Sequence, residues 1–231
     1  VLAGEADVVQ TITYQTVAAN PNGRELAAYE WPGGKELWKT SLPGDVDERL
    51  IAVKDDQIYA LAKGAGMLGM ELRTGKCLWT NSSEELQADF TVPPSKQLGD
   101  FLFSQPGMMA VDDTLVLRAR WAKSTTVLSR ADGKRLWRKA YGGGYRGIQF
   151  VAYNGQILGC GNTPLDLHTG AATNGPRFAS SGCGPTTAVP GYLITCFGAV
   201  SDAQTGKSIR GADIKSPCDI GSLVSEGVMI T

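Results

Sequence analysis

The chain has 231 residues, of which 42% are apolar and 19% are charged, so it is long enough to fold around a substantial core. Its 22 basic and 23 acidic residues give a formal net charge of −1, which provides no field for steering onto nucleic acid or an anionic membrane. No run approaches the roughly 18 consecutive apolar residues that a membrane-spanning helix needs. The composition predicts a soluble globular protein that does not bind nucleic acid.

The start of the sequence differs from that of a complete secreted protein. It begins with Val1 rather than methionine, and residues 1–20 lack the basic-then-apolar order of a secretory signal. We therefore expect that the natural start has been removed or that the chain is a fragment.

A short turn followed by a tryptophan occurs three times, with the pattern G-K-x-x-W. The copies occupy Gly34–Trp38, Gly75–Trp79 and Gly133–Trp137. Two later turns, at Gly170 and Gly206, lack the tryptophan. The five glycines are 41, 58, 37 and 36 residues apart, which predicts repeated structural units with glycine at a turn of positive φ.

A second marker recurs in phase with the first, namely a turn dipeptide that leads into an apolar strand. It occurs at Asp56–Leu61, Asp113–Leu117, Asn154–Leu158, Pro190–Ile194 and Glu226–Ile230. Since the runs are short and rich in β-formers, each unit is predicted to consist of antiparallel strands joined by tight turns.

Repeated units of this kind predict an all-β fold, a β-propeller of four-stranded antiparallel blades. Five turn markers and the opening strand of a sixth unit indicate five to six blades in residues 1–231, as one incomplete domain of a seven- or eight-bladed propeller. We expect Trp38, Trp79 and Trp137 to be buried at contacts between blades. The loss of tryptophan from the last two units predicts different packing there.

The 58-residue spacing contains an insertion, residues 82–107, which carries two proline-containing stretches that are incompatible with a continuous strand. It is predicted to be an inserted loop, either a binding surface or a neutral surface excursion. A second loop, residues 142–147, matches G-x-G-x-x-G by letter but precedes a strand rather than a helix, which excludes a dinucleotide site. Its Tyr145 and Arg146 are candidate ligand-binding residues for an anionic group, whereas a loop without a ligand is the alternative.

The five cysteines form no C-x-x-C pair, and the single histidine, His168, lies in a turn, so neither a metal site nor a catalytic residue is predicted. Cys183 and Cys218 are candidates for a disulfide between loops of successive blades, whereas free thiols are the alternative. Cys160 and Cys196, 36 residues apart, are the competing pair.

The repeat resembles the PQQ-like propeller repeat of quinoprotein dehydrogenases and their non-catalytic relatives, from about Asn22 to Thr231. Its cysteine-bearing end is similar to PQQ-like repeat proteins inferred from bacterial, planctomycete-type genomes. The resemblance implies a fold but no activity. The dehydrogenases add a calcium-holding Glu/Asn/Asp set and, in many members, a vicinal cysteine pair, and neither can be matched here.

The leading hypothesis is therefore a non-catalytic propeller located outside the cytoplasm, in the periplasm, at the cell surface or secreted, that binds protein or carbohydrate partners without an evident cofactor. The alternative is a quinoprotein-type oxidoreductase that uses PQQ with calcium and has some cofactor ligands outside this chain. A hydrolase or lyase is disfavoured because one turn histidine offers little acid–base capacity.

Overall fold

The structure is a computed structural model of the 231-residue chain. It describes residues 7–12, 22–90, 107–119, 124–140, 150–159, 163–177, 186–194, 199–209, 223–225 and 228–230.

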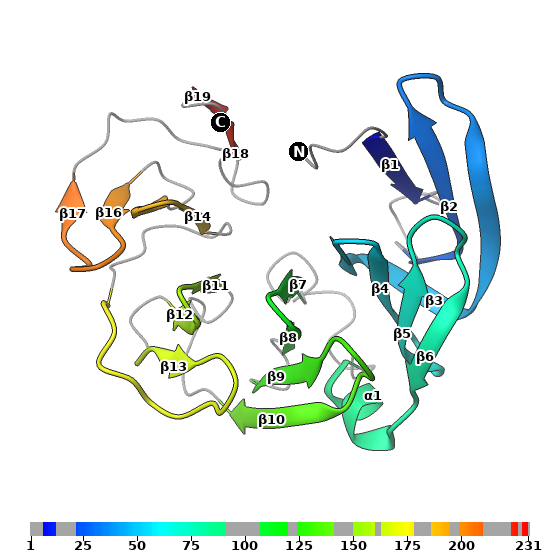
Figure 1. Ribbon diagram of the computed structural model, residues 1–231. Coiled ribbons are helices and arrows are strands. Elements are labelled where there is room, and N and C mark those ends of the chain that lie inside the picture. The colour runs from blue at the N-terminus through cyan, green and yellow to red at the C-terminus, as the bar shows by residue number, and fades with distance from the viewer. Residues whose placement is uncertain are drawn as a thin grey trace, which may run out of the picture. The chain divides into compact units, whose positions relative to one another are not determined.

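The described residues form antiparallel strands and one short helix, which confirms the all-β prediction (Figure 1). The elements of the first half are β1 (Asp7–Ile12), β2 (Asn22–Trp31), β3 (Glu36–Lys54), β4 (Gln57–Ala62), β5 (Gly66–Glu71), β6 (Cys77–Asn81), α1 (Glu84–Phe90), β7 (Gly107–Val111), β8 (Thr114–Ala119), β9 (Ser124–Ser129) and β10 (Arg135–Ala140). Those of the second half are β11 (Phe150–Tyr153), β12 (Gln156–Gly159), β13 (Leu165–Asp166), β14 (Thr187–Val189), β15 (Tyr192–Ile194), β16 (Val200–Asp202), β17 (Ser208–Ile209), β18 (Leu223–Ser225) and β19 (Val228–Ile230).

The strands are arranged in sheets that follow the chain order. The first sheet runs β1-β2-β3-β4-β5-β6, and two further sheets have four strands each, in the orders β10-β9-β8-β7 and β14-β15-β16-β17. A three-stranded sheet, β11-β12-β13, and the hairpin β18-β19 complete the set. Every neighbour is therefore a sequence neighbour, as expected of repeats that each fold from consecutive strands.

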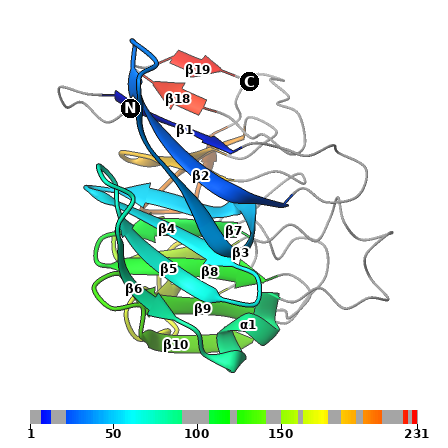
Figure 2. The same ribbon diagram turned by 90° about the vertical axis from the view of Figure 1, so that its right-hand side faces the viewer.

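The first two repeats share one sheet because β3 is long enough to serve both (Figure 2). Its first part pairs with β2, where Leu26 lies opposite Thr40, and its last part pairs with β4, where Val53 lies opposite Ile58. The pairing with β4 shifts in register between Val46 and Ile51. The first two repeats thus form one six-stranded sheet, because no turn divides the outer strand of one repeat from the inner strand of the next.

The chain divides into two compact units, the first holding most described residues up to 135 and the second most of those from 136 onward. The first unit buries two apolar clusters, one around Ile58 and Leu68 and one around Tyr59 and Leu115. The second buries a smaller cluster around Leu158. Each fully buried leucine or isoleucine stabilises its unit by about 1.5–3 kcal/mol.

The segment predicted as an inserted loop begins with a helix. Within residues 82–107 the structure describes residues 82–90 and Gly107, and α1 spans Glu84–Phe90. Leu86 of α1 is buried in the cluster around Tyr59, so the start of this segment packs against the sheet. The functional role of the insertion stays a prediction.

Candidate functional site

The last turn of each repeat has the same hydrogen-bond pattern in all five repeats. In the second repeat, the Glu71 amide donates to the carbonyl of Lys76 at 2.8 Å, and the Gly75 amide donates to the carbonyl of Glu71 at 2.9 Å. The same two bonds recur at the equivalent positions of the other repeats, where Glu30, Ser129, Asp166 and Asp202 replace Glu71. The five predicted glycines have φ between 68° and 71°, the left-handed region that glycine enters without steric cost.

In the fourth and fifth repeats, which lack a tryptophan of their own, an aspartate side chain accepts hydrogen bonds within the turn. Oδ1 of Asp202 accepts from the Thr205 amide at 2.7 Å and from the Thr205 hydroxyl at 2.9 Å. Asp166 and Thr169 make the same pair of bonds, both at 2.8 Å. Because these bonds favour the carboxylate, they lower the pKa of Asp166 and of Asp202 below the ordinary value.

A third backbone bond ties this turn to the first hairpin of the same repeat. The donor is the residue three positions before the turn glycine, for example Leu72, whose amide donates to the carbonyl of Asp56 at 2.8 Å. Arg130, Leu167 and Ala203 repeat this contact in the next three repeats. These bonds hold both turns at one end of each sheet. The carbonyl group of the residue three positions before the turn glycine, which can accept a hydrogen bond from a tryptophan, is therefore held in the same way in these repeats.

The three repeated tryptophans bind this acceptor in the following repeat. Nε1 of Trp38 donates to the carbonyl of Leu72 at 2.8 Å, that of Trp79 to Arg130 at 3.0 Å, and that of Trp137 to Leu167 at 2.9 Å. All three side chains are half-buried rather than fully buried. Each indole therefore joins two successive repeats and satisfies its own N–H group there.

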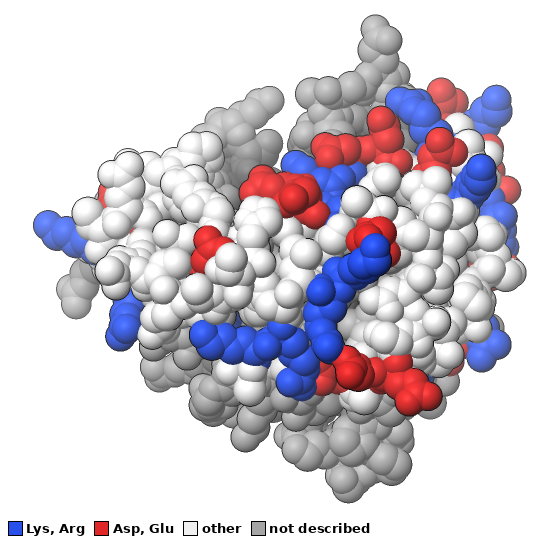
Figure 3. Space-filling view, turned by 60° about the horizontal axis from the view of Figure 1, so that its bottom comes forward, with Lys and Arg blue, Asp and Glu red and all other residues white. Residues whose placement is uncertain are grey.

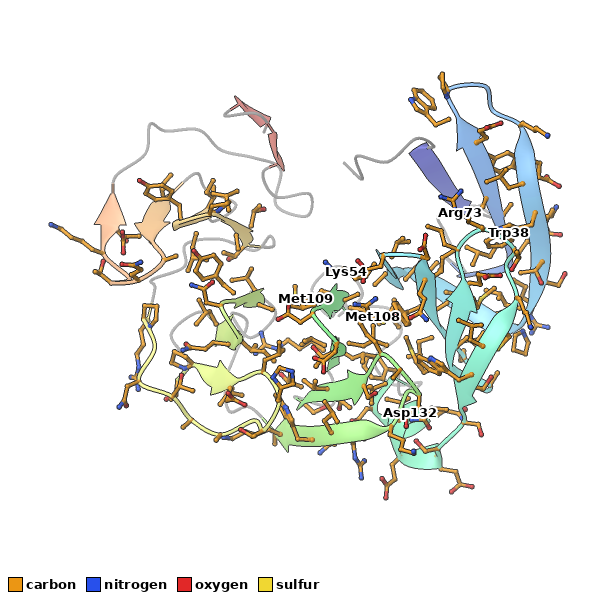
Figure 4. All side chains as sticks on the ribbon, in the orientation of Figure 1. Trp38, Lys54, Arg73, Met108, Met109 and Asp132 are labelled. Atoms are coloured by element: carbon orange, nitrogen blue, oxygen red, sulfur yellow. The ribbon has the colours of Figure 1, made fainter. Side chains whose placement is uncertain are left out.

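The turn glycines lie directly beneath the indole rings. A Cβ atom on Gly75 would come within 2.6 Å of the Trp38 ring, and one on Gly170 within 2.7 Å of the Trp137 ring. Gly133 faces Trp79 in the same way. In Figure 4, Trp38 lies beside Arg73 of the β5–β6 turn. Glycine is thus required twice, for its positive φ and for the close approach of the ring.

Where the tryptophan is missing, the junction is built from backbone. Gly206, the last of the five turn glycines, faces the carbonyl of Arg177 instead of an indole. A side chain at Gly206 would still meet that carbonyl. The junction between the fourth and fifth repeats is therefore packed differently from the three before it.

A polar cluster that sequence analysis missed joins the second and third repeats. Nε of Arg130 donates to the Tyr59 hydroxyl at 2.8 Å, and Nη2 donates to Oδ2 of Asp55 at 2.9 Å. The same guanidinium reaches the carbonyls of Lys54 and Asp112, and its Cζ lies 5.5 Å from the centre of the Tyr59 ring. The Arg130 side chain is only 12% exposed, so this fork of donors is largely shielded from water.

Burial and hydrogen bonding act in opposite directions on these groups. Burial of Tyr59 raises its pKa above the ordinary value, although the hydrogen bond from Arg130 opposes that change. Partial burial lowers the pKa of Arg130, but its bonds to Tyr59 and Asp55 outweigh this effect and raise it overall. The cluster thus holds a protonated tyrosine and a charged arginine, which suits a structural contact better than proton transfer.

The sequence did carry a signal for this cluster. The position three before the turn glycine holds Leu72, Leu167 and Ala203 in other repeats, all buried. Arg130 occupies that position in the third repeat. A charged residue at an otherwise apolar repeat position indicates a specific partner, here the buried Tyr59.

The outer strands expose a leucine at one repeated position, directly before each tryptophan. Leu37, Leu78 and Leu136 are 39%, 46% and 44% exposed. Around Leu136, basic residues precede β10 at Lys134 and lie on it at Arg135, Arg138 and Lys139. Asp132 pairs with Lys134 at 2.7 Å and Glu85 with Arg135 at 2.6 Å, whereas Lys139 donates to the neutral carbonyl of Gly170. Figure 3 shows basic and acidic side chains next to each other on one face.

The other residues singled out from the sequence are only partly described. His168 is exposed, and its backbone amide donates to Asp166. Tyr145 and Arg146, and both candidate cysteine pairs, Cys183 with Cys218 and Cys160 with Cys196, lie outside the described residues. Cys77, which is described, is a free and exposed thiol.

Nowhere in the described residues do three or more His, Cys, Asp or Glu side chains converge as a metal-binding group. None of their helices has the length and hydropathy needed to cross a membrane.

Comparison with known structures identifies the fold. The crystal structure of BamB from Moraxella catarrhalis matches with a TM-score of 0.58 and 15% identity, over 91% of this chain and 64% of that one. The computationally designed Ika8 protein matches with a TM-score of 0.57 and 12% identity, over 90% of this chain and 62% of that one. The chain thus spans less than two thirds of the length of both proteins. At these identities the likeness establishes the fold alone, a β-propeller.

Comparison of the sequence with curated proteins finds no match. Residues 4–154 match the family model described as outer membrane protein assembly factor BamB, which has the PQQ-like repeat. This match covers more than half of the sequence, and it includes the three G-K-x-x-W turns and the Arg130 cluster. The chain therefore belongs to the family of outer membrane protein assembly factor BamB.

Proposed function

We propose that this chain is a non-catalytic scaffold that binds a protein partner outside the cytoplasm of a bacterial cell. The observation that carries the proposal is its membership of a family described as an outer membrane protein assembly factor. An assembly factor acts through protein contacts. The repeated junctions support a scaffold role, because each of the three indoles donates a hydrogen bond to the following repeat.

Strand β10 is the contact surface that we propose for this partner. Among the described strands it has a neighbour on one side only, so its other edge carries backbone groups that an added strand can use. Leu136 supplies exposed apolar area, and Arg138 and Lys139 add positive charge. Positive charges on an edge strand also disfavour pairing with unrelated strands. An acidic strand would be attracted to them, so we propose that the partner supplies an acidic strand.

The proposal is tested by site-specific photo-crosslinking in the native cell envelope. A crosslinking residue in place of Leu136 should trap a discrete protein, and one in place of Tyr192, which is equally exposed at 44%, should not. Arg138→Glu with Lys139→Glu should weaken capture at 136. Recovery of the same proteins from both positions, or of none, would contradict the proposed surface. Binding of the chain to a polysaccharide array without a protein crosslink would favour a carbohydrate partner instead.

A cofactor is not part of this proposal. Bound PQQ with calcium would require a converging set of oxygen ligands. Among the described residues, no three or more His, Cys, Asp or Glu side chains form a group that could hold a metal ion. Isothermal titration of the chain with PQQ and Ca²⁺ tests this directly, and saturable binding would revive the oxidoreductase hypothesis.

A further inference from the structure

Asparagine followed by glycine occurs three times in the sequence, at Asn22, Asn154 and Asn174. This dipeptide has a reactivity of its own, because the backbone nitrogen of the glycine can attack the side-chain carbonyl carbon of the asparagine. Glycine favours the attack because it has no side chain beside that nitrogen. The structure places the three dipeptides in different surroundings, which decide how readily each can react.

Asn154 and Gly155 form the two-residue turn between β11 and β12. Asn154 is exposed and has φ of 48°, and Gly155 has φ of 69°. No backbone carbonyl of the described residues accepts a hydrogen bond from the Gly155 amide. Apart from its chain neighbours, no described residue has an atom within 4 Å of the place that a Cβ on Gly155 would take. The attacking nitrogen and the space around it are therefore open.

The dipeptide at Asn174 is more constrained. The Gly175 amide donates to the hydroxyl of Thr173 at 3.4 Å. A Cβ atom on Gly175 would overlap Oε1 of Gln156, so the space beside this glycine is filled. Pro176 follows directly and restricts the backbone of Gly175.

The dipeptide at Asn22 belongs to a strand. Asn22 lies opposite Asp47 and Gly23 lies opposite Val46 in the pairing of β2 with β3. The sheet thus limits the backbone rotation that ring closure at this asparagine needs.

We propose that Asn154 is a site of spontaneous deamidation, at which the asparagine becomes aspartate or isoaspartate. A bond forms between the Gly155 nitrogen and Cγ of Asn154, the Gly155 nitrogen gives its proton to water, and the side-chain amide leaves as ammonia. The product is a cyclic succinimide. Water then opens the ring, at the side-chain carbonyl to give aspartate or at the main-chain carbonyl to give isoaspartate. One water is consumed and one ammonia is released, without oxidation or reduction.

Isoaspartate changes the turn more than aspartate does, because it adds a carbon atom to the main chain between residues 154 and 155. The Gly155 carbonyl accepts a hydrogen bond from the Leu167 amide at 2.8 Å, and the Leu167 carbonyl accepts one from Nε1 of Trp137 at 2.9 Å. A displaced Gly155 therefore loosens the acceptor of Trp137. Aspartate leaves the main chain unchanged and adds only a negative charge. This inference concerns the chemistry of one turn and does not depend on the proposed surface on β10.

Peptide mapping by mass spectrometry tests the site in the 231-residue chain. One sample is incubated folded at mildly alkaline pH and another is incubated unfolded in guanidinium chloride, and conversion of the three asparagines is followed in both. The three should convert at similar rates in the unfolded chain. In the folded chain, Asn154 should convert roughly tenfold faster than Asn22 or Asn174, a barrier difference of about 1.4 kcal/mol.

Asn154→Gly is the matched control for the effect on the fold, because glycine also adopts positive φ but has no side-chain amide. The aged parent chain should unfold at a lower denaturant concentration than the fresh chain, in proportion to its content of isoaspartate. The aged Asn154→Gly variant should show no such shift. Asn154→Asp, freshly prepared, should unfold like the fresh parent, which separates the added charge from the added main-chain atom.

Two results would overturn the proposal. The first is conversion of Asn22 or Asn174 in the folded chain at the rate of Asn154 or faster, a measurement that needs no variant. The second is an equal shift on ageing in the parent and in Asn154→Gly, which would assign the damage to another residue. Circular dichroism of the fresh variants establishes that they are folded like the parent.

Discussion

Nε1 of Trp79 donates to the carbonyl oxygen of Arg130 at 3.0 Å, although the two residues are 51 positions apart. Arg130 in turn sends its guanidinium back to Tyr59 in the repeat that carries Trp79. The Tyr59 and Trp79 rings are themselves in contact, with centroids 6.0 Å apart. The second and third repeats are thus joined by bonds that run in both directions, which makes this junction the most suitable one for mutational tests.

Trp79→Ala should lower the free energy of unfolding by about 3 kcal/mol, at the lower end of the range for buried tryptophan because the ring is half-buried. Urea unfolding of the 231-residue chain measures the change. Trp31→Ala is the control, and since Trp31 is 54% exposed its effect should stay within about 0.5 kcal/mol. Equal effects of the two substitutions would show that Trp79 does not hold the repeats together.

Gly75→Ala and Gly155→Ala separate steric overlap from backbone strain. Both glycines have φ of 69°, so alanine should cost each variant about 1 kcal/mol from the backbone alone. Only at Gly75 does the new Cβ meet an indole ring, which should add roughly 1–3 kcal/mol of overpacking. Thermal unfolding of the two variants measures the stability that each loses. An equal loss of stability in both variants would rule out a close approach of the Trp38 ring to Gly75.

Arg130→Ala should destabilise the chain by about 2 kcal/mol, because it removes charge-assisted hydrogen bonds from a largely shielded site. Arg130→Leu should recover part of this loss, since leucine occupies the same position at Leu72 and Leu167.

A double-mutant cycle with Tyr59→Phe should give a coupling free energy of about 1 kcal/mol with Arg130→Ala. Denaturant unfolding of the four proteins supplies the cycle. Additive effects would mean that the contact between Arg130 and Tyr59 contributes nothing of its own.

Acid stability should depend on the turn aspartates. Hydrogen bonds from Thr205 lower the pKa of Asp202, so the folded state binds the proton more weakly than the unfolded state. This contribution is present above the unfolded pKa of about 3.9 and is lost as the pH falls through the lower, folded pKa. Asp202→Asn should therefore flatten the fall in stability below about pH 5.

Thr205 provides the matched control for that experiment. Thr205→Val removes the hydroxyl that donates to Asp202 at 2.9 Å, and it should flatten the acid limb in the same direction. Thr205→Ser keeps the hydroxyl and should leave the profile close to that of the parent. Identical acid limbs in the valine and serine variants would contradict this role of the hydroxyl.

The sequence predicted those features that each repeat encodes locally. The glycine of each turn is required by its positive φ, and the spacing of the turns fixed where strands begin. The continuity of β3 was not predictable, because Pro43 and Gly44 suggest an interruption, whereas the structure carries one strand through them. The Arg130 cluster also escaped, since its partner Tyr59 is 71 residues away and only folding brings them together. The edge position of β10 likewise depends on which strands pair.

The shared strand β3 also bears on how the number of repeats can change in evolution. Between Gly34 and Gly75 the chain passes through one complete repeat of 41 residues, and all strands of this segment lie in the same sheet. Recombination between the two turns would join β2 to β6 through a turn that keeps both of its backbone hydrogen bonds, because the same bonds recur in both turns and both glycines have φ of 69°. A cut between the first and second repeats at the middle of this sheet, by contrast, would fall inside β3 and leave half a strand on each product. The segment that a genome can duplicate or delete without damage therefore extends from turn to turn rather than from blade to blade.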